Sequence, residues 1–394
     1  MQSAESHRAP HIPRDYAVPM PEAHAHRRDR LRSRLAGAGA DVALITNLVN
    51  VRYLTGFTGS NAALLVYTPG AAGEGSDAGA VLCTDGRYAA QATEESPGVE
   101  LVVDRACAQT LTRRAASTGA VRLAIEEQHV TVELHRALGG VLAETNAAAQ
   151  LVALGRVVED LRRIKDVEEI AALRIACEIG DRALGEMIES ILVGRTERHI
   201  AMELERRMAD HGADAVAFPT VVATGPNSAI PHHDPGDRRV EDGDFLKIDF
   251  GARYHGYHGD MTRTFVIGTE PAGWQQEIYH VVFAAQKAGR EALVPGVEAV
   301  AVDRAAREVI EQAGYLEFFP HGLGHGVGLE IHEDPRLGPT ATGKLDACMP
   351  VTVEPGIYLP GRGGVRIEDT LVVRPLEDGG PELLTITTKE LLVL

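Results

Sequence analysis

The stretch from His321 to Pro335, HGLGHGVGLEIHEDP, places three histidines in a glycine-rich setting. They are His321, His325 and His332, and a glycine lies on each side of the middle one. Neutral imidazole is the commonest side-chain ligand of a metal ion, and glycine lets the backbone approach a neighbour closely. One histidine alone would be typical of an exposed loop. The spacing of three indicates a metal or catalytic site whose other ligands must come from elsewhere in the chain.

Carboxylates occur in two later segments that both have the pattern of a strand, a turn and a strand. Asp249 stands inside the apolar run FLKIDF, and Asp260 follows it across a turn rich in glycine and histidine. A buried aspartate is unfavourable unless a cation or donor pairs with it. Capping of a turn explains Asp260 equally well but explains Asp249 poorly. Glu354 and Glu368 repeat the arrangement near the C-terminus.

Together these residues form an oxygen-rich set of five candidate metal ligands: Asp249, Asp260, His325, Glu354 and Glu368. Divalent cations of the hard or borderline class prefer carboxylate oxygen, and bridging carboxylates offset the repulsion between two adjacent cations. A structural zinc site more often uses thiolates or several histidines. The four cysteines form no CxxC pair, so we expect reduced thiols rather than zinc ligands or disulfides.

The elements that must position these residues indicate two domains, since 394 residues exceed the usual size of one core. Residues 1–24 carry four prolines and no periodicity, which predicts a flexible extension. From 25 to 155 short apolar runs alternate with helical patterns, which predicts an α/β domain with a largely buried sheet. Residues 156–394 begin with a long helical pattern and continue with strand pairs rich in Gly, Asp and His. All the unusual chemistry lies in this second domain.

The overall composition excludes several other classes of protein. A formal net charge of −17 disfavours nucleic acid and anionic membranes as partners, because phosphate binding depends on clustered Lys and Arg. No apolar run approaches the roughly 18 residues of a membrane span, and the first residues lack the apolar core of a signal peptide. We therefore expect a cytoplasmic protein. No GxGxxG or GKS motif supports nucleotide binding.

The five ligands stand in the contexts IDFGARYHGYHGDMTRTF, HGLGHGVGLEIHE, VEPGIY and VRIEDT. In this order and setting the chain resembles the proline-specific pita-bread metallopeptidases, the aminopeptidase P and prolidase group. The segments NVRYLTGFTGSNAALLV and TDGRYAAQA are similar to the creatinase-type domain of that group, so the resemblance covers about residues 27–394. It implies an α/β N-terminal creatinase-like domain followed by an α+β pita-bread catalytic domain. It also implies two divalent metal ions, with Mn²⁺ favoured and Co²⁺ or Zn²⁺ as alternatives.

The resemblance also assigns the residues around the metals. His321 and His332 would line the substrate site, and GPNSAIPHH supplies a further histidine, His232. Arg366 matches an arginine that orients the ligating acids or contacts the substrate. The chain departs from the family at His233, where a small residue is usual. A second departure is a glycine at position 259, where serine is often found. We expect His233 to narrow the entrance of the site.

The expected reaction is hydrolysis of a peptide bond by water that two divalent ions make acidic. Glu354 would take the proton of this water and deliver it toward the leaving nitrogen. His332 and His232 would donate hydrogen bonds to the substrate carbonyl. Because the nitrogen of an Xaa-Pro bond carries no hydrogen, the enzyme needs an apolar slot for the ring, with His321 in its wall.

The expected substrate is a peptide or dipeptide with proline in the second position, and the family suggests a homo-oligomer, dimer or tetramer. The motif TGFTGS favours an Xaa-Pro aminopeptidase, and an Xaa-Pro dipeptidase is the alternative. A methionine aminopeptidase would share the five ligands, but the N-terminal domain and the sequence contexts argue against it. A creatinase-like hydrolase lacks the ligand set. A non-catalytic binding protein on the same scaffold usually has ligand positions replaced, which is not the case here.

Overall fold

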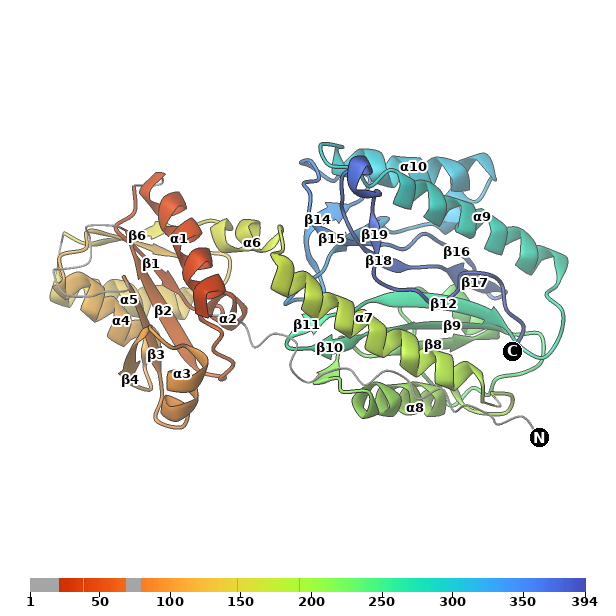
Figure 1. Ribbon diagram of the computed structural model, residues 1–394, viewed down its shortest axis with the longest axis horizontal. Coiled ribbons are helices and arrows are strands. Elements are labelled where there is room, and N and C mark those ends of the chain that lie inside the picture. Colours follow the sequence, from red (N-terminus) through yellow and green to blue (C-terminus); the bar gives the residue numbers. More distant parts are fainter. Residues whose placement is uncertain (1–20, 38, 69–78, 147, 191) are drawn as a thin grey trace, which may run out of the picture. The chain divides into compact units, whose positions relative to one another are not determined.

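The computed structural model describes residues 21–37, 39–68, 79–146, 148–190 and 192–394. They fall into two compact units, Met1–Ile125 with Val130–Val152, and Glu126–His129 with Ala153–Leu394 (Figure 1). Residues 1–20 of the predicted extension lie outside the described residues, whereas residues 21–24 belong to the first helix, α1 (Pro21–Gly37). Across the described ranges, no helix has both the length and the apolar character to cross a membrane.

Within its described residues, the N-terminal unit is built on a six-stranded mixed sheet of order β4-β3-β2-β1-β5-β6. Strand β1 pairs antiparallel with β2 and parallel with β5, and β3 pairs antiparallel with β2 and parallel with β4. The strands are β1 (Val42–Ile45), β2 (Ala62–Tyr67), β3 (Ala80–Thr84), β4 (Glu100–Val103), β5 (Arg122–Ile125) and β6 (Gln150–Ala153). The other helices are α2 (Leu48–Thr55), α3 (Ala89–Glu95), α4 (Cys107–Ser117) and α5 (Val132–Thr145). Every residue of β1, β2 and β3 is buried, as expected for a sheet covered on both faces.

The second unit begins with three helices, α6 (Val157–Arg162), α7 (Val167–Ile188) and α8 (Glu197–Asp210). Helix α7 starts at a capping box in which Asp166 and Glu169 bond each other's backbone N–H groups, which fixes its first turn. Helices α7 and α8 pack through one apolar core on the sheet β12-β9-β8. Its strands are β8 (Val221–Thr224), β9 (Phe245–Phe250) and β12 (Met261–Val266).

A second core lies under helices α9 (Gly273–Glu291) and α10 (Ala299–Gln312), which pack on a sheet of order β14-β13-β15-β18-β19 (Figure 1). Its strands are β13 (Gly324–Gly326), β14 (Glu333–Leu337), β15 (Pro350–Val353), β18 (Asp369–Val372) and β19 (Glu382–Leu383). The smaller strands are β7 (Ala215–Val216), β10 (Ala252–Tyr254), β11 (Tyr257–His258), β16 (Gly356–Leu359) and β17 (Gly363–Arg366). Short 3₁₀ turns are η1 (Gly225–Ala229), η2 (Leu316–Phe318) and η3 (Leu376–Asp378).

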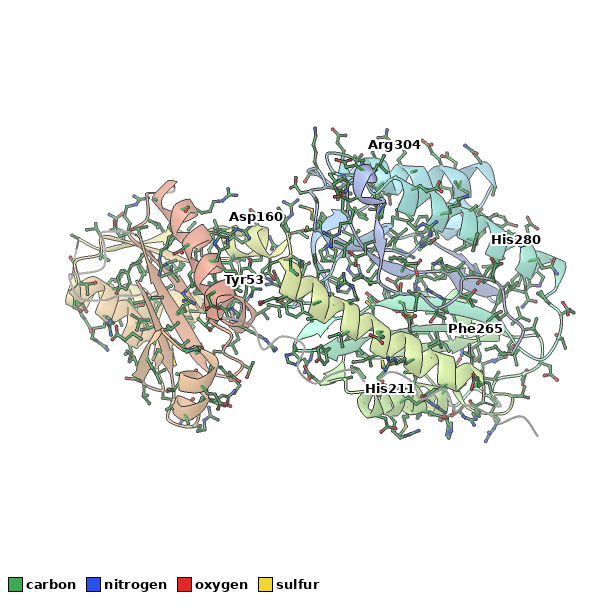
Figure 2. The ribbon with its side chains drawn as sticks, in the orientation of Figure 1. Tyr53, Asp160, His211, Phe265, His280 and Arg304 are labelled. Carbon is green, nitrogen blue, oxygen red and sulfur yellow. The ribbon has the colours of Figure 1, made fainter. Side chains whose placement is uncertain are left out.

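The sheets β12-β9-β8 and β14-β13-β15-β18-β19 meet beside strand β12. Thr262 forms an isolated bridge with Glu368, whose N–H donates to the Thr262 carbonyl at 3.1 Å. Phe265 of the same strand points into the α7–α8 core, whereas His280 and Arg304 on α9 and α10 point to solvent (Figure 2). The bridge therefore brings the strand ends of both sheets together, and the predicted ligands lie on these ends.

Candidate metal centre and substrate pocket

The five predicted ligands come from five different places along the second unit. Asp249 lies in β9, Asp260 directly before β12, His325 in β13, Glu354 after β15 and Glu368 directly before β18. One ligand atom each of Asp260, His325 and Glu368 lies within 4.8 Å of the other two. The His325 Nε2 atom is 3.6 Å from Asp260 Oδ2 and 3.4 Å from Glu354 Oε1. The structure thus gathers acids that are more than a hundred residues apart in sequence.

Strand pairing and a glycine explain how these side chains reach one another. Thr262 lies opposite Asp249 in the β9–β12 pair and donates through Oγ1 to Glu368 Oε2 at 2.7 Å, so it stands between two ligands. On the other sheet, β13 passes so close to β15 that a Cβ on Gly324 would lie 2.0 Å from the Thr352 carbonyl oxygen. Only glycine fits there. The close approach of backbone expected around His325 is therefore present.

The acids strongly perturb one another. Burial first, then the charges of Glu368, Asp249 and Glu354, raise the pKa of Asp260 well above its usual value. Burial and the charges of Glu354 and Asp249 do the same for Glu368. Burial raises the pKa of Glu354 to about 8, although Arg366 acts in the opposite direction. Carboxylates this crowded can all ionise only when cations lie among them.

Two details test whether this donor set suits a cation. Asp249 Oδ1 is buried and has no hydrogen-bond partner in the described part of the chain. His325 Nδ1 bonds the Gly326 carbonyl oxygen at 3.0 Å, so Nδ1 carries the hydrogen and the Nε2 lone pair faces two carboxylate oxygens. Burial lowers the pKa of His325 to about 3, so the ring is neutral. A lone pair facing carboxylates is unfavourable unless a metal ion lies between them, and the oxygen-rich set fits divalent cations.

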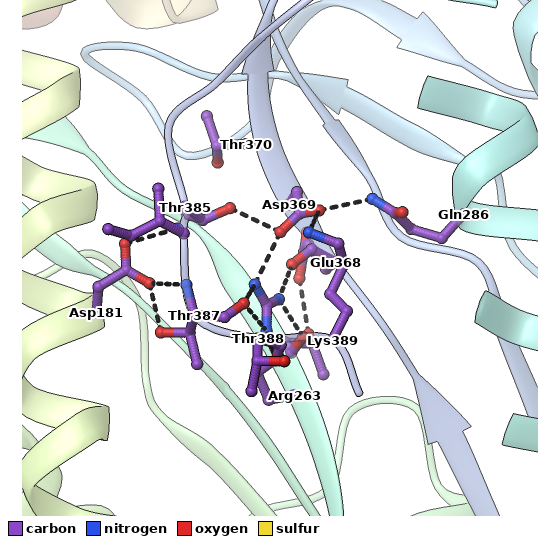
Figure 3. A network of polar contacts seen from close by, with 12 residues as sticks. Asp181, Arg263, Gln286, Glu368, Asp369, Thr370, Thr385, Thr387, Thr388 and Lys389 are labelled. Atoms are coloured by element: carbon purple, nitrogen blue, oxygen red, sulfur yellow. Dashed lines mark hydrogen bonds and ion pairs between the residues drawn. The ribbon is translucent and has the colours of Figure 1, made fainter. Parts of the chain in front are cut away.

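A buried polar network of hydrogen bonds fixes the backbone of Glu368 (Figure 3). The neighbouring Asp369 is fully buried and accepts hydrogen bonds from Arg263 Nη2 at 2.8 Å, Gln286 Nε2 at 2.7 Å and Thr385 Oγ1 at 2.9 Å. Arg263 Nη1 donates to the Glu368 carbonyl oxygen at 2.5 Å. The same guanidinium donates to the carbonyl oxygen of Thr387 at 2.7 Å. The C-terminal segment therefore helps to fix a candidate metal ligand.

Arg366 uses its buried guanidinium within the protein. Its Nε donates to Thr262 Oγ1 at 3.0 Å, Nη1 donates to Tyr358 OH at 2.8 Å and to the Pro231 carbonyl oxygen at 3.1 Å, and Nη2 pairs with Asp249 Oδ2. The side chain is only 2 % exposed although it lines the pocket. Of the two roles expected for this arginine, the geometry favours orientation of the ligating acids.

His321 also has both ring nitrogens engaged. Burial lowers the pKa of His321 to about 4, so the ring is neutral. Nδ1 lies 2.8 Å from the Gly322 carbonyl oxygen and therefore carries the hydrogen, which leaves Nε2 to accept from Tyr358 OH at 2.9 Å. Tyr358 in turn accepts from Arg366. Tyr358 was not predicted from the sequence, and it links Arg366 to the histidine at the pocket wall.

The loop that carries His232 is fixed by a buried lysine. Lys247 Nζ donates to the carbonyl oxygens of Ser228 at 3.0 Å and Ile230 at 2.7 Å, and lies 4.9 Å from the centre of the Tyr358 ring. Burial and the charge of Arg366 hold the pKa of Lys247 well below its usual value. Lys247 therefore ties β9, which carries Asp249, to the segment leading to His232.

A cavity of about 540 Å³ lies at the cluster, and every residue predicted for the site lines it. The exposed His332 has its ring centre 4.5 Å from that of His325, and burial and the charge of Arg336 lower its pKa. Arg336 itself is exposed and also lines the cavity. His233 lines it too, but with its ring bonded to Glu197 Oε2 at 2.8 Å.

Close packing against helix α7 explains why a glycine stands at position 259. A Cβ there would lie 3.0 Å from the Ala176 carbonyl carbon and 3.1 Å from the Cys177 nitrogen, both in the backbone of α7. Helix α7 thus packs too closely for serine without a local shift.

Comparison with known proteins agrees with this geometry. Residues 171–375 match metallopeptidase family M24, and residues 27–164 match the creatinase/prolidase N-terminal domain. An Xaa-Pro dipeptidase of Pyrococcus furiosus is 48% identical over 236 residues, which are 60% of this chain and 67% of that protein.

Two solved structures resemble this chain over more than nine-tenths of its length. The Xaa-Pro dipeptidase from Bacillus anthracis has a TM-score of 0.86 and 36% identity, covering 94% of this chain and 100% of that one. The X-Pro aminopeptidase from Thermotoga maritima MSB8 has a TM-score of 0.83 and 35% identity, covering 93% and 99%. The predicted two-domain fold and the predicted class of enzyme are confirmed, and the chain belongs to metallopeptidase family M24 with a creatinase/prolidase N-terminal domain.

Proposed function

We propose that this enzyme is an Xaa-Pro aminopeptidase, which hydrolyses the bond between an N-terminal residue and a following proline. The supporting observation is the state of His321, whose ring nitrogens are both bonded within the protein. A wall of this kind accepts no hydrogen bond from the substrate. An ordinary amide N–H placed against it would be left unpaired, whereas proline has no N–H to leave unpaired. Relatives named as X-Pro aminopeptidase and Xaa-Pro dipeptidase support the same preference.

The metal is proposed to be held by five clustered side chains, those of Asp249, Asp260, His325, Glu354 and Glu368. Two divalent ions, Mn²⁺ by resemblance, would acidify water and polarise the scissile carbonyl when bound. Arg366 pairs with Asp249 and so holds that ligand in place. Glu354 lines the cavity, and its side chain is 18 % exposed against 8 % for His325. It is proposed to accept the proton of the water and pass it to the leaving nitrogen.

Two histidines at the cavity are proposed to act on the substrate carbonyl. His332 and His232 are exposed and line the cavity, so either can donate a hydrogen bond to a bound substrate. Such donors stabilise negative charge that develops on the carbonyl oxygen. His321 is proposed to form the wall against the proline ring rather than to donate.

The alternative is an Xaa-Pro dipeptidase, and Arg336 is the observation that favours it. This exposed arginine lines the cavity and forms no ion pair with any described residue, whereas the guanidinium of Arg366 is occupied. A dipeptidase would use such a cation for the free carboxylate of proline. In an aminopeptidase the same region must admit a third residue.

The test compares Ala-Pro, Ala-Ala, Ala-Pro-Ala and Ala-Ala-Ala with stripped enzyme reloaded with Mn²⁺, Co²⁺ or Zn²⁺. Proline specificity predicts kcat/KM values well over tenfold higher for the Pro member of each pair; similar values would refute it. An aminopeptidase should accept Ala-Pro-Ala readily. If the enzyme is a dipeptidase instead, Arg336→Ala should lower kcat/KM for Ala-Pro selectively. Arg304→Ala, at an exposed position on α10, should change kcat/KM for neither Ala-Pro nor Ala-Pro-Ala. The expected homo-oligomer is tested separately by light scattering.

A further inference from the structure

The side chain of Glu197 is an unusual acceptor at the start of α8, close to the loop that carries His232. It is fully buried. Oε1 accepts from Thr224 N at 2.8 Å and Asn227 Nδ2 at 2.9 Å, and Oε2 accepts from Gly236 N at 3.0 Å and His233 Nε2 at 2.8 Å. A buried carboxylate with this many donors is a fixed, oriented group.

This carboxylate is ionised. Burial alone would raise the pKa of Glu197, but hydrogen bonds from Asn227, His233 and two backbone N–H groups outweigh it and hold the pKa below its usual value. The position in the first turn of α8 also favours a negative charge, because the helix dipole is positive there. No Lys or Arg side chain forms an ion pair with Glu197 among the described residues.

The ionised Glu197 determines which ring nitrogen of His233 carries the hydrogen. Nε2 faces a carboxylate oxygen and must donate to it, so in the neutral ring Nδ1 holds the lone pair. Nδ1 has no hydrogen-bond partner in the part of the chain that the structure describes, and it is not buried. His233 lines the cavity that holds the metal cluster. The pair therefore presents an oriented acceptor on the substrate side, outside the set of five ligands.

The next residue strengthens the acceptor character of this wall. Asp234 is exposed and lines the same cavity. An imidazole that donates to one carboxylate and is followed by a second carboxylate favours a group that is both a donor and positively charged. The expectation that His233 only narrows the entrance is therefore incomplete.

The chemistry of the substrate leaves few candidates for that partner. In an Xaa-Pro substrate the scissile nitrogen carries no hydrogen, so the backbone donor on the N-terminal side is the free α-ammonium. We propose that His233, oriented by Glu197, accepts a hydrogen bond from the α-ammonium of the first substrate residue and thereby selects unblocked N-termini. The inference rests on the proposed function. His233 contacts the substrate, and Glu197 is a positioning residue.

The experiment uses the metal-loaded full chain and two ligands that differ only at this group. Ala-Pro is measured as a substrate, and propionyl-Pro, in which hydrogen replaces the ammonium, is measured as a competitive inhibitor. His233→Phe keeps a ring but removes both nitrogens. It should raise KM for Ala-Pro about tenfold or more, the scale of a lost hydrogen bond to a charged group. It should leave kcat and the Ki of propionyl-Pro within about twofold of wild type.

The matched control is His211→Phe, which breaks another histidine–glutamate pair, His211 with Glu186 at 3.0 Å, away from the cavity (Figure 2). It should leave the KM for Ala-Pro and the Ki of propionyl-Pro unchanged. Glu197→Gln should shift KM for Ala-Pro in the same direction as His233→Phe, with metal content at the wild-type level.

The outcomes separate this inference from the function on which it rests. If His233→Phe weakened the binding of Ala-Pro and propionyl-Pro equally, or weakened neither, the proposed role of His233 would be overturned. Metal loss in His233→Phe would also overturn it, since the residue would then support the cluster. Failure of the wild-type enzyme to hydrolyse both Ala-Pro and Ala-Pro-Ala would refute the proposed function itself.

Discussion

Replacement of Glu333 by glutamine should destabilise the second unit by about 3 kcal/mol. The Glu333 carboxylate accepts from Arg162 Nη2 at 2.5 Å and from Lys165 Nζ at 2.7 Å, and all three side chains are at most 5 % exposed. Burial alone would raise the pKa of Glu333, but Lys165 and Arg162 lower it from 4.5 to about 2. That difference, 4.5 minus 2 or about 2.5 units, corresponds to roughly 3 kcal/mol. The amide of glutamine would leave the buried Lys165 without its negative partner and would weaken the pairing of the buried Arg162, which carries a similar penalty.

The assay is urea unfolding followed by tryptophan fluorescence, at pH 7 with the metal removed by chelation. The chain has a single tryptophan, Trp274 in α9, so the signal reports on the second unit. Glu330→Gln is the matched control, because Glu330 also pairs with Arg162, at 2.7 Å, but is 44 % exposed. Exposed pairs contribute at most about 1 kcal/mol.

The effect should also depend on pH in a defined direction. The folded-state pKa of Glu333 lies below the usual value, so its contribution is complete above about pH 4.5 and is lost as pH falls toward about 2. The difference between wild type and Glu333→Gln should therefore shrink below pH 4.5. A loss below 1 kcal/mol at pH 7, or one equal to that of Glu330→Gln, would refute the reasoning.

Three further predictions concern the cluster itself. Glu368→Ala should lose bound metal and peptidase activity together, as measured by elemental analysis and Ala-Pro hydrolysis; activity in protein shown to be metal-free would contradict the cluster. His325→Ala should weaken metal binding, whereas His332→Ala should keep metal and lower turnover on the order of 100-fold. Equal metal loss in both variants would mean that these roles are wrongly assigned. Gly324→Ala should lower stability by on the order of 3 kcal/mol, because its Cβ would lie 2.0 Å from the Thr352 carbonyl oxygen; an unchanged unfolding midpoint would disprove that contact.

The strands of the N-terminal sheet could be predicted where they are buried on both faces. The apolar runs that contain β1, β2 and β3 have no polar interruption, which is the pattern of a covered sheet. Strand β6 was not predicted: it lies at the sheet edge, is only partly buried, and its short apolar run at residues 151–154 is followed at once by a glycine. Helix α4 was also missed, since Leu111 is the one large apolar residue in its buried stripe.

The residues of the candidate metal centre could be predicted only where the signal is local in the sequence. Asp249 inside an apolar strand and the glycines around His325 are local signals. The partners of Glu197 and Asp369 give no local signal, because each carboxylate accepts hydrogen bonds from donors distant in sequence. Asn227 is such a donor to Glu197, and Arg263 is such a donor to Asp369. Asp369 follows Glu368 directly, so sequence alone could have indicated a second buried acid but not its cations.

The distribution of buried cations explains why the cluster needs metal ions. Arg263 and Lys389 compensate Asp369, and Arg162 compensates Glu333, so these cations are paired with acids that adjoin the site residues and not with the ligands. Among the four acids proposed as ligands in the described chain, the one with an arginine partner is Asp249, paired with Arg366.

Four ionised carboxylates would carry a formal charge of −4 beside a neutral histidine, and two divalent cations would supply +4. Without cations, the crowded acids hold protons instead, as the raised pKa values of Asp260 and Glu368 show. Metal binding should therefore release protons from these acids, because their ionised form is stable only beside the cations. The carboxylates that hold protons in the absence of cations are therefore the same groups that would bind divalent ions once ionised.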